Sequence, residues 1–329
     1  MNQRIGLFEI NFDMIQIIRN NFVFGMISKV NIKLLITLVC FAFLGNSIFG
    51  NFESLSNQTI GRQEILWLIG GIIFSFLSII INAYAWKLLI NSIVFHSNKL
   101  NIIKIFLATN IYKYLPGGIW HFVSRFNTLR LELSTEKSVE SILLEPLLML
   151  VAGLIFIPFG SFNITVFILC WSSTLVFLPI FREFLIKKLK EMKANLFTKT
   201  DHIKDRKLVE NHQNISKRIF YPYKPLFVEI IFILSRFIGF LCCINAFSIG
   251  SLISQGELIS SFSLAWIIGL IVPAAPGGLG VFESVILFRL GSHLPEAPLL
   301  ASLLCYRLVS TTSDVCAALI YPVKKLFKV

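Results

Sequence analysis

The sequence predicts an all-α integral membrane protein with about six full transmembrane helices and two re-entrant broken helices in an inverted repeat. Of the 329 residues, 55% are hydrophobic and only 15% are charged, a more apolar composition than a soluble core requires. Several apolar runs reach the roughly 20 residues that cross a bilayer. The tripeptide Pro-Gly-Gly interrupts two apolar segments, at 116–118 and 276–278, which are 160 residues apart.

The apolar segments define the elements in order along the chain. Residues 1–33 mix apolar and charged positions and are predicted to lie at the membrane interface as an amphipathic segment. A single transmembrane domain then covers 34–325. Its predicted full spans are 34–50, 65–94, 141–159, 163–180, 226–250 and 298–322, and its two broken segments are 101–128 and 259–291.

The distribution of Lys and Arg predicts the orientation. The loop 181–224 carries twelve Lys and Arg against five Asp and Glu, so the positive-inside rule places it in the cytoplasm. The C-terminal sequence VKKLFKV belongs on the same side. The loops 51–64 and 292–298 contain one Arg between them and are expected to face out. Both termini are therefore predicted to be cytoplasmic.

Six spans with both ends inside require 101–128 and 259–291 each to return to the side from which it enters. Glycine permits close backbone approach, and proline disfavours helix at the residue before it. Irregular backbone at membrane depth must be buried in protein or face water, so both hairpins are expected inside the bundle. The predicted breaks are Pro116, Gly117, Gly118, Pro276, Gly277, Gly278 and Gly280.

A shift of 160 residues aligns the two halves of the domain. It moves 65–94, 101–128 and 141–159 onto 225–254, 261–288 and 301–319. The predicted repeat units are thus about 65–159 and 226–322, opposite in direction, with 163–180 as connector. Inverted repeats place broken helices around a substrate site at the bilayer midplane. The alternative is that two kinks in an ordinary helical bundle coincide by chance.

Ionisable residues at membrane depth gather in the repeat units. Such charges need a partner or a water-filled cavity. Structural pairing is the favoured interpretation for Glu145, Glu229 and Asp314. Phosphate binding is favoured for Arg125 and Arg307, because the guanidinium fork fits phosphate oxygens. The predicted substrate-binding residues are Arg125, Arg307, Arg236, Glu283, Glu145, Asp314, His121 and Lys113. His121 as a satisfied polar residue and Lys113 as an interfacial side chain are the alternatives.

Other site chemistries lack their sequence signals. The six cysteines lie in predicted spans without metal-ligand spacing, and no G-x-x-x-x-G-K-[ST] motif is present. The formal net charge of +12 arises beside apolar runs, which favours membrane orientation over nucleic-acid binding. No metal, cofactor or nucleic-acid partner is therefore expected.

At these motifs the sequence resembles the transmembrane region of lysylphosphatidylglycerol synthases and its stand-alone relatives, over about residues 30–325. The most distinctive match is Pro-Gly-Gly-x-Gly-x-x-Glu in PAAPGGLGVFESVIL. The others are AWKLLINSI, NIYKYLPGGIWHFVSRF, SILLEPLLML and YRLVS. Trp120 and His121 stand where relatives frequently have small residues, which points to a different lipid head group.

The resemblance implies a flippase-like fold in the bacterial cytoplasmic (inner) membrane. In two-part members this region moves an aminoacylated phospholipid between leaflets, and a separate soluble domain synthesises that lipid. No synthase domain is expected here, so the chain is predicted to be a transporter rather than an enzyme. The expected partners are membrane lipids, namely an anionic or aminoacylated phospholipid, a glycolipid or a polyprenyl phosphate, with a homo-oligomer as a further option.

The predicted function is a lipid flippase that moves a phospholipid or a lipid-linked glycan. One alternative is an integral membrane enzyme or accessory protein acting on lipid-linked sugars, which would need clustered carboxylates or a metal motif. Neither Asp-x-Asp nor a His cluster occurs in the chain. The other alternative is a non-catalytic scaffold that recruits partners through the basic loop 181–224.

Overall fold

The computed structural model describes residues 61–94, 101–115, 119–161, 163–178, 221–272 and 280–320, together with residues 49 and 53. The predicted interfacial segment, the body of the span 34–50 and most of the basic loop lie outside this part of the chain. So do six of the predicted break residues, Pro116, Gly117, Gly118, Pro276, Gly277 and Gly278.

The described part of the chain is helical and contains no strand. Its α-helices are α3 (Arg62–Ile93), α4 (Ile102–Asn110), α5 (Trp120–Leu129), α6 (Thr135–Leu154), α7 (Ile164–Ser172), α10 (Tyr223–Ala246), α11 (Gln255–Ile271), α12 (Val281–Leu290) and α13 (Glu296–Ile320). The 3-10 helices η1 (Ile111–Tyr114), η2 (Ile157–Gly160) and η3 (Ser173–Phe177) continue α4, α6 and α7.

Four of these helical segments are long and apolar enough to cross a membrane. They are Arg62–Ile93, Thr135–Gly160, Tyr223–Ala246 and Glu296–Ile320. Each coincides with a predicted span. Two shorter apolar helices, Ile164–Phe177 and Gln255–Ile271, fall on the predicted span 163–180 and on the second broken segment. The chain is therefore an all-α integral membrane protein.

Polar residues at the helix starts explain several boundaries. The side chain of Ser134 accepts a hydrogen bond from the backbone N–H of Lys137, and Ser254 does the same for Glu257. The Ser134 cap starts α6 before the apolar stretch that predicted a span from residue 141. Gly280 precedes α12 with φ of 81°, a left-handed conformation that favours glycine.

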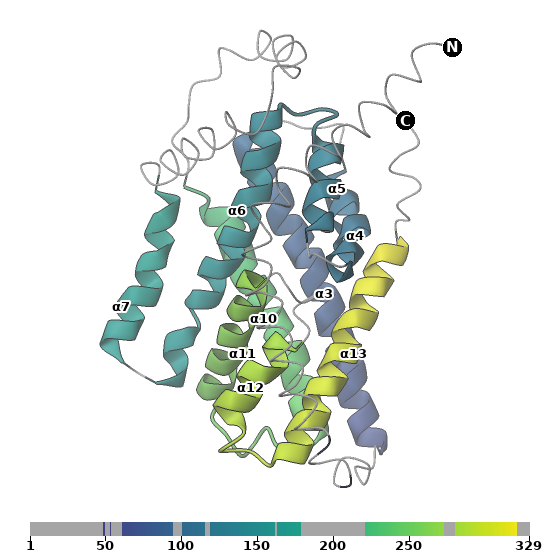
Figure 1. Ribbon diagram of the computed structural model, residues 1–329, viewed down its shortest axis with the longest axis vertical. Helices are drawn as coiled ribbons and strands as arrows, with labels where there is room; N and C mark the ends of the chain where they lie inside the picture. The colour runs from purple at the N-terminus through teal and green to yellow at the C-terminus, as the bar shows by residue number, and fades with distance from the viewer. Residues whose placement is uncertain are drawn as a thin grey trace.

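The helices form a bundle in which the two helix-break-helix segments occupy opposite ends (Figure 1). The pair α4 and α5 lies in the upper half of the view, whereas α11 and α12 lie in the lower half. The long helices α3, α6, α10 and α13 surround them. The start of α6 and the start of α10 lie in the upper half of the view, and α13 rises from the lower end to about the level of α4.

The most extensive contact between described helices joins α3 and α10. A Cβ atom added at Gly71 would lie 3.3 Å from the Gly239 carbonyl oxygen, and one at Gly239 would lie 3.3 Å from the Gly71 carbonyl oxygen. The Ser235 hydroxyl also donates to the Phe74 carbonyl at 3.0 Å. Small residues bring helix backbones together in membranes, where packing and hydrogen bonds drive association.

Two apolar clusters fill the interior. The first joins α3, α4 and α6 around Trp86, Phe106 and Leu148. The second joins α10 to α13 around Phe240, Phe262 and Phe282, with their rings 5.4 to 6.0 Å apart. Charged side chains lie between the two clusters and form the site described next.

Candidate functional site

A cavity of about 220 Å³ lies at the centre of the bundle. Residues from both helix-break-helix segments and from the four long helices line it. Six of the eight residues predicted to bind substrate are among the lining residues: Lys113, His121, Arg125, Glu145, Arg236 and Arg307. The other two, Glu283 and Asp314, form ion pairs with lining residues. The fold thus brings together charges that are far apart in the sequence.

Arg125 and Glu145 form the first ion pair. Arg125 Nη1 donates to both carboxylate oxygens of Glu145, at 2.6 and 2.7 Å, and Nε donates to Thr109 Oγ1 at 3.2 Å. The Arg125 guanidinium carbon lies 3.8 Å from the ring centre of Phe106 and 5.1 Å from that of Trp86. The pair therefore holds α5 against α6 and α4, and its charges cancel locally.

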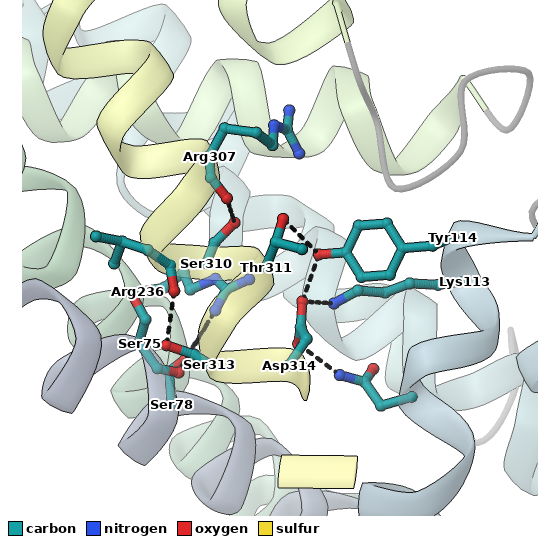
Figure 2. Close-up of polar contacts among 12 residues, drawn as sticks. Ser75, Ser78, Lys113, Tyr114, Arg236, Arg307, Ser310, Thr311, Ser313 and Asp314 are labelled. Atoms are coloured by element: carbon teal, nitrogen blue, oxygen red, sulfur yellow. Dashed lines mark hydrogen bonds and ion pairs between the residues drawn. The ribbon is translucent and has the colours of Figure 1, made fainter. Parts of the chain in front are cut away.

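Asp314 is the centre of the second cluster, which ties α13 to the first helix-break-helix segment (Figure 2). Its Oδ2 pairs with Lys113 Nζ at 2.8 Å and accepts from the Tyr114 hydroxyl at 2.6 Å. Its Oδ1 accepts from Asn110 Nδ2 at 2.7 Å, and Tyr114 also reaches Thr311 at 3.4 Å. A fully buried carboxylate thus receives three donors from α4 and η1.

Glu283 and Arg307 form the third pair, which ties α13 to the second helix-break-helix segment. Arg307 Nε donates to Glu283 Oε1 at 2.7 Å. The other oxygen, Oε2, accepts the backbone N–H of Gly280 at 2.8 Å. Glu283 therefore both caps the start of α12 and neutralises Arg307. Arg307 and Asp314 are seven residues apart, or about two turns, so α13 holds the two segments through one face.

Arg236 differs from the other cations. Its Nη1 makes two long hydrogen bonds, 3.4 Å to the Ser75 carbonyl and 3.5 Å to Ser78 Oγ (Figure 2). Its buried Nε has no hydrogen-bond partner. None of the ion pairs within the described ranges includes Arg236. The sequence interpretation favoured Arg125 and Arg307 as phosphate ligands, but the cation that lacks a carboxylate partner is Arg236.

Several polar atoms that line the cavity have no hydrogen-bond partner among the residues that the structure describes. They are Asn82 Oδ1, His121 Nδ1, Arg236 Nε, Trp266 Nε1 and the Tyr306 hydroxyl. His121 packs against Phe122 with ring centres 3.8 Å apart. Buried polar atoms normally find hydrogen-bond partners, so this concentration favours a cavity that holds water or a polar ligand.

The sequence interpretation missed several polar residues of the site, among them Asn82, Asn110, Tyr114, Trp266 and Tyr306. An Asn or Tyr in an apolar segment is only a weak indication of a binding site, and a Trp there is usually interpreted as a packing residue. Only their convergence on Asp314 and on the cavity identifies them. In the part of the chain that the structure describes, no group of three or more His, Cys, Asp or Glu could hold a metal ion.

Comparison with protein families matches residues 30–318 to the model described as the lysylphosphatidylglycerol synthase TM region. The match covers both helix-break-helix segments and all the cavity residues. A search of curated proteins finds no match.

Proposed function

Because the chain belongs to the lysylphosphatidylglycerol synthase transmembrane-region family, we propose that it moves a lipid between the two leaflets of a membrane. The cargo is a phospholipid or a lipid-linked glycan, whose head group enters the central cavity while its acyl or polyprenyl chains stay in the bilayer. The protein acts as a transporter, without a chemical step, in the bacterial cytoplasmic membrane with both termini inside.

The observation that carries this proposal is a cavity between membrane-length helices whose mainly apolar lining includes several charged side chains. Four cationic side chains line it, Lys113, Arg125, Arg236 and Arg307. Charge at membrane depth is costly and marks pathways for polar substrates. The cavity has a volume of about 220 Å³. A cavity of roughly 150 Å³ holds benzene, so this one has room for a larger polar group.

The transport architecture that we propose has six full spans, two re-entrant hairpins and an inverted repeat. The opposite placement of α4 with α5 and of α11 with α12 supports it (Figure 1). The ion pairs support it too. Arg125–Glu145 joins the second half-helix of one hairpin to the next long helix, and Glu283–Arg307 does the same in the other half with the charges exchanged.

Alternating access then follows from the two attachments on α13. Lys113–Asp314 holds the first hairpin, and Glu283–Arg307 holds the second. Release of one attachment while the other stays closed would open the cavity to one side of the membrane only. We expect the attachment at Asp314 to be harder to break than the one at Glu283, because three donors bind the Asp314 carboxylate.

The test is lipid exchange in vesicles. The purified protein is reconstituted with fluorescent phosphatidylglycerol, a glycolipid or a polyprenyl phosphate, and dithionite quenching reports the fraction in each leaflet. We expect selective exchange of one class, reduced at least about tenfold by Asp314→Asn through loss of charge-assisted hydrogen bonds. Arg62→Gln, at the exposed start of α3, is the control. Absence of exchange for every class by folded wild-type protein would contradict the proposal.

A further inference from the structure

Three hydrogen-bond donors that have no partner in the described part of the chain line the same cavity. They are Arg236 Nε from α10, Trp266 Nε1 from α11 and the Tyr306 hydroxyl from α13. Arg236 is 4% exposed and Tyr306 is 5% exposed. Three different helices of the second half thus supply unsatisfied donors to the same space.

Aromatic packing holds these donors near one another. The Arg236 guanidinium carbon lies 5.5 Å from the ring centre of Trp266. The Phe262 ring lies 6.3 Å from Trp266 and 6.1 Å from Tyr306, and so connects the two. The Tyr306 hydroxyl lies beside the Arg236 guanidinium. The donors therefore sit on a fixed aromatic framework rather than on mobile side chains.

The charges around the cavity do not balance. Lys113, Arg125 and Arg307 each have a carboxylate partner: Asp314, Glu145 and Glu283, respectively. Arg236 has none among the described residues. The nearest acidic residue on its own helix, Glu229, is seven residues away, or about 10 Å along the axis, and does not line the cavity. Arg236 is therefore a buried cation without a carboxylate of its own, because Asp314, the carboxylate that acts on it, already pairs with Lys113. A buried cation that shares its counter-charge in this way is stabilised by a bound anion.

We propose that Arg236, Trp266 and Tyr306 form an anion-binding subsite for a group with a single phosphodiester charge. One such group would supply the missing negative charge and accept all three donors through its oxygens. The carboxylates beside the cavity are occupied by their own cations, so the site offers none to an amine. It therefore favours a lipid with net charge −1, such as phosphatidylglycerol or a polyprenyl phosphodiester of a sugar, over a zwitterionic or aminoacylated one. The assignment of the bound anion to a lipid head group rests on the proposed function, whereas the anion subsite itself does not.

Binding to the purified full-length protein tests the subsite without any transport step. Native mass spectrometry in detergent would give apparent dissociation constants for phosphatidylglycerol, phosphatidylethanolamine and diacylglycerol. We expect phosphatidylglycerol to bind at least about tenfold tighter than the other two, because only it matches the unpaired charge and donors. Inorganic phosphate, added as a competitor, separates a lipid head group from a free phosphate ion.

Tyr306→Phe is the decisive variant, because it removes one hydroxyl and keeps the ring in the aromatic framework. It should weaken phosphatidylglycerol binding by about tenfold, and Arg236→Gln should weaken it by tenfold or more. Matched controls are Tyr84→Phe and Arg62→Gln, which change the same groups at exposed positions of α3. Should Arg236→Gln fail to fold, Tyr306→Phe still decides the matter.

Unchanged phosphatidylglycerol affinity in folded Tyr306→Phe protein would overturn the subsite. Equal binding of the three lipids would overturn the charge selection. Displacement of phosphatidylglycerol by an equal concentration of inorganic phosphate would overturn the lipid assignment. Selective binding without leaflet exchange in vesicles would support the subsite and contradict the transport function. Leaflet exchange by Tyr306→Phe protein with undiminished binding would support the transport function and contradict the subsite.

Discussion

At the scale of single residues, α10 carries two buried ionisable side chains of opposite charge, and neither forms an ion pair with a described residue. Arg236 lies at the cavity with unused donors. Glu229 is 1% exposed, its Oε2 has no hydrogen-bond partner, and it takes part in no ion pair within the described part of the chain. Glu145, by contrast, places both carboxylate oxygens on Arg125. Two equally buried glutamates should therefore respond differently to neutralisation.

We predict that Glu145→Gln lowers the free energy of unfolding by about 3–5 kcal/mol, because it leaves Arg125 buried without a counter-charge. Glu229→Gln should change it by less than about 1 kcal/mol, because no cation depends on that carboxylate. Unfolding of the purified variants in mixed micelles titrated with a denaturing detergent measures both values. Equal losses from the two substitutions would show that Glu229 has an ion-pair role of its own.

At the scale of elements, glycines without side chains allow the close approach of α3 and α10. A Cβ at Gly239 would lie 2.6 Å from Ser75 Oγ and 3.3 Å from the Gly71 carbonyl oxygen. A Cβ at Gly70, on the same stretch of α3, would lie 3.6 Å from Cys242 Sγ, an ordinary contact. A backbone oxygen cannot rotate away as a side chain can, so the two glycines are not equivalent.

Gly239→Ala should lower the free energy of unfolding by about 1–3 kcal/mol, because α3 and α10 must separate to admit the methyl group. Gly70→Ala is the matched control, and we expect its stability to stay close to that of the wild type. Thermal unfolding followed by intrinsic fluorescence gives the comparison. Wild-type stability in Gly239→Ala would mean that the two helices adjust without cost.

At the scale of the whole molecule, the turns of the bundle divide between its two ends (Figure 1). The end of α3 and the turn between α5 and α6 lie at one end. The turns between α10 and α11 and between α12 and α13 lie at the other. If both broken segments are re-entrant, each hairpin starts and finishes on the same side of the membrane.

Single cysteines introduced at exposed positions test this topology in a background without the six native cysteines. We predict that Asn91→Cys and Leu131→Cys react with an impermeant maleimide only from the cytoplasmic side. Ser251→Cys and Ser292→Cys should react only from the outside, because 259–291 returns to its starting side. Labelling of Asn91→Cys and Leu131→Cys from opposite sides would mean that 101–128 crosses the membrane, and the inverted repeat would fail with it.

The sequence by itself determined the long helices. Apolar length predicted α3, α6, α10 and α13, because the bilayer fixes how many residues a span needs. The cost of charge in hydrocarbon also predicted that Arg125, Glu145 and Asp314 face the interior.

Only the tertiary structure decided which charges pair. Arg125 pairs with Glu145 only 20 residues away, whereas Asp314 pairs with Lys113 from the other half of the chain. These choices depend on how each helix is rotated against its neighbours, and periodicity fixes only the face that turns inward. The structure therefore singled out Arg236, whose lack of a carboxylate is a property of its surroundings and not of its sequence position.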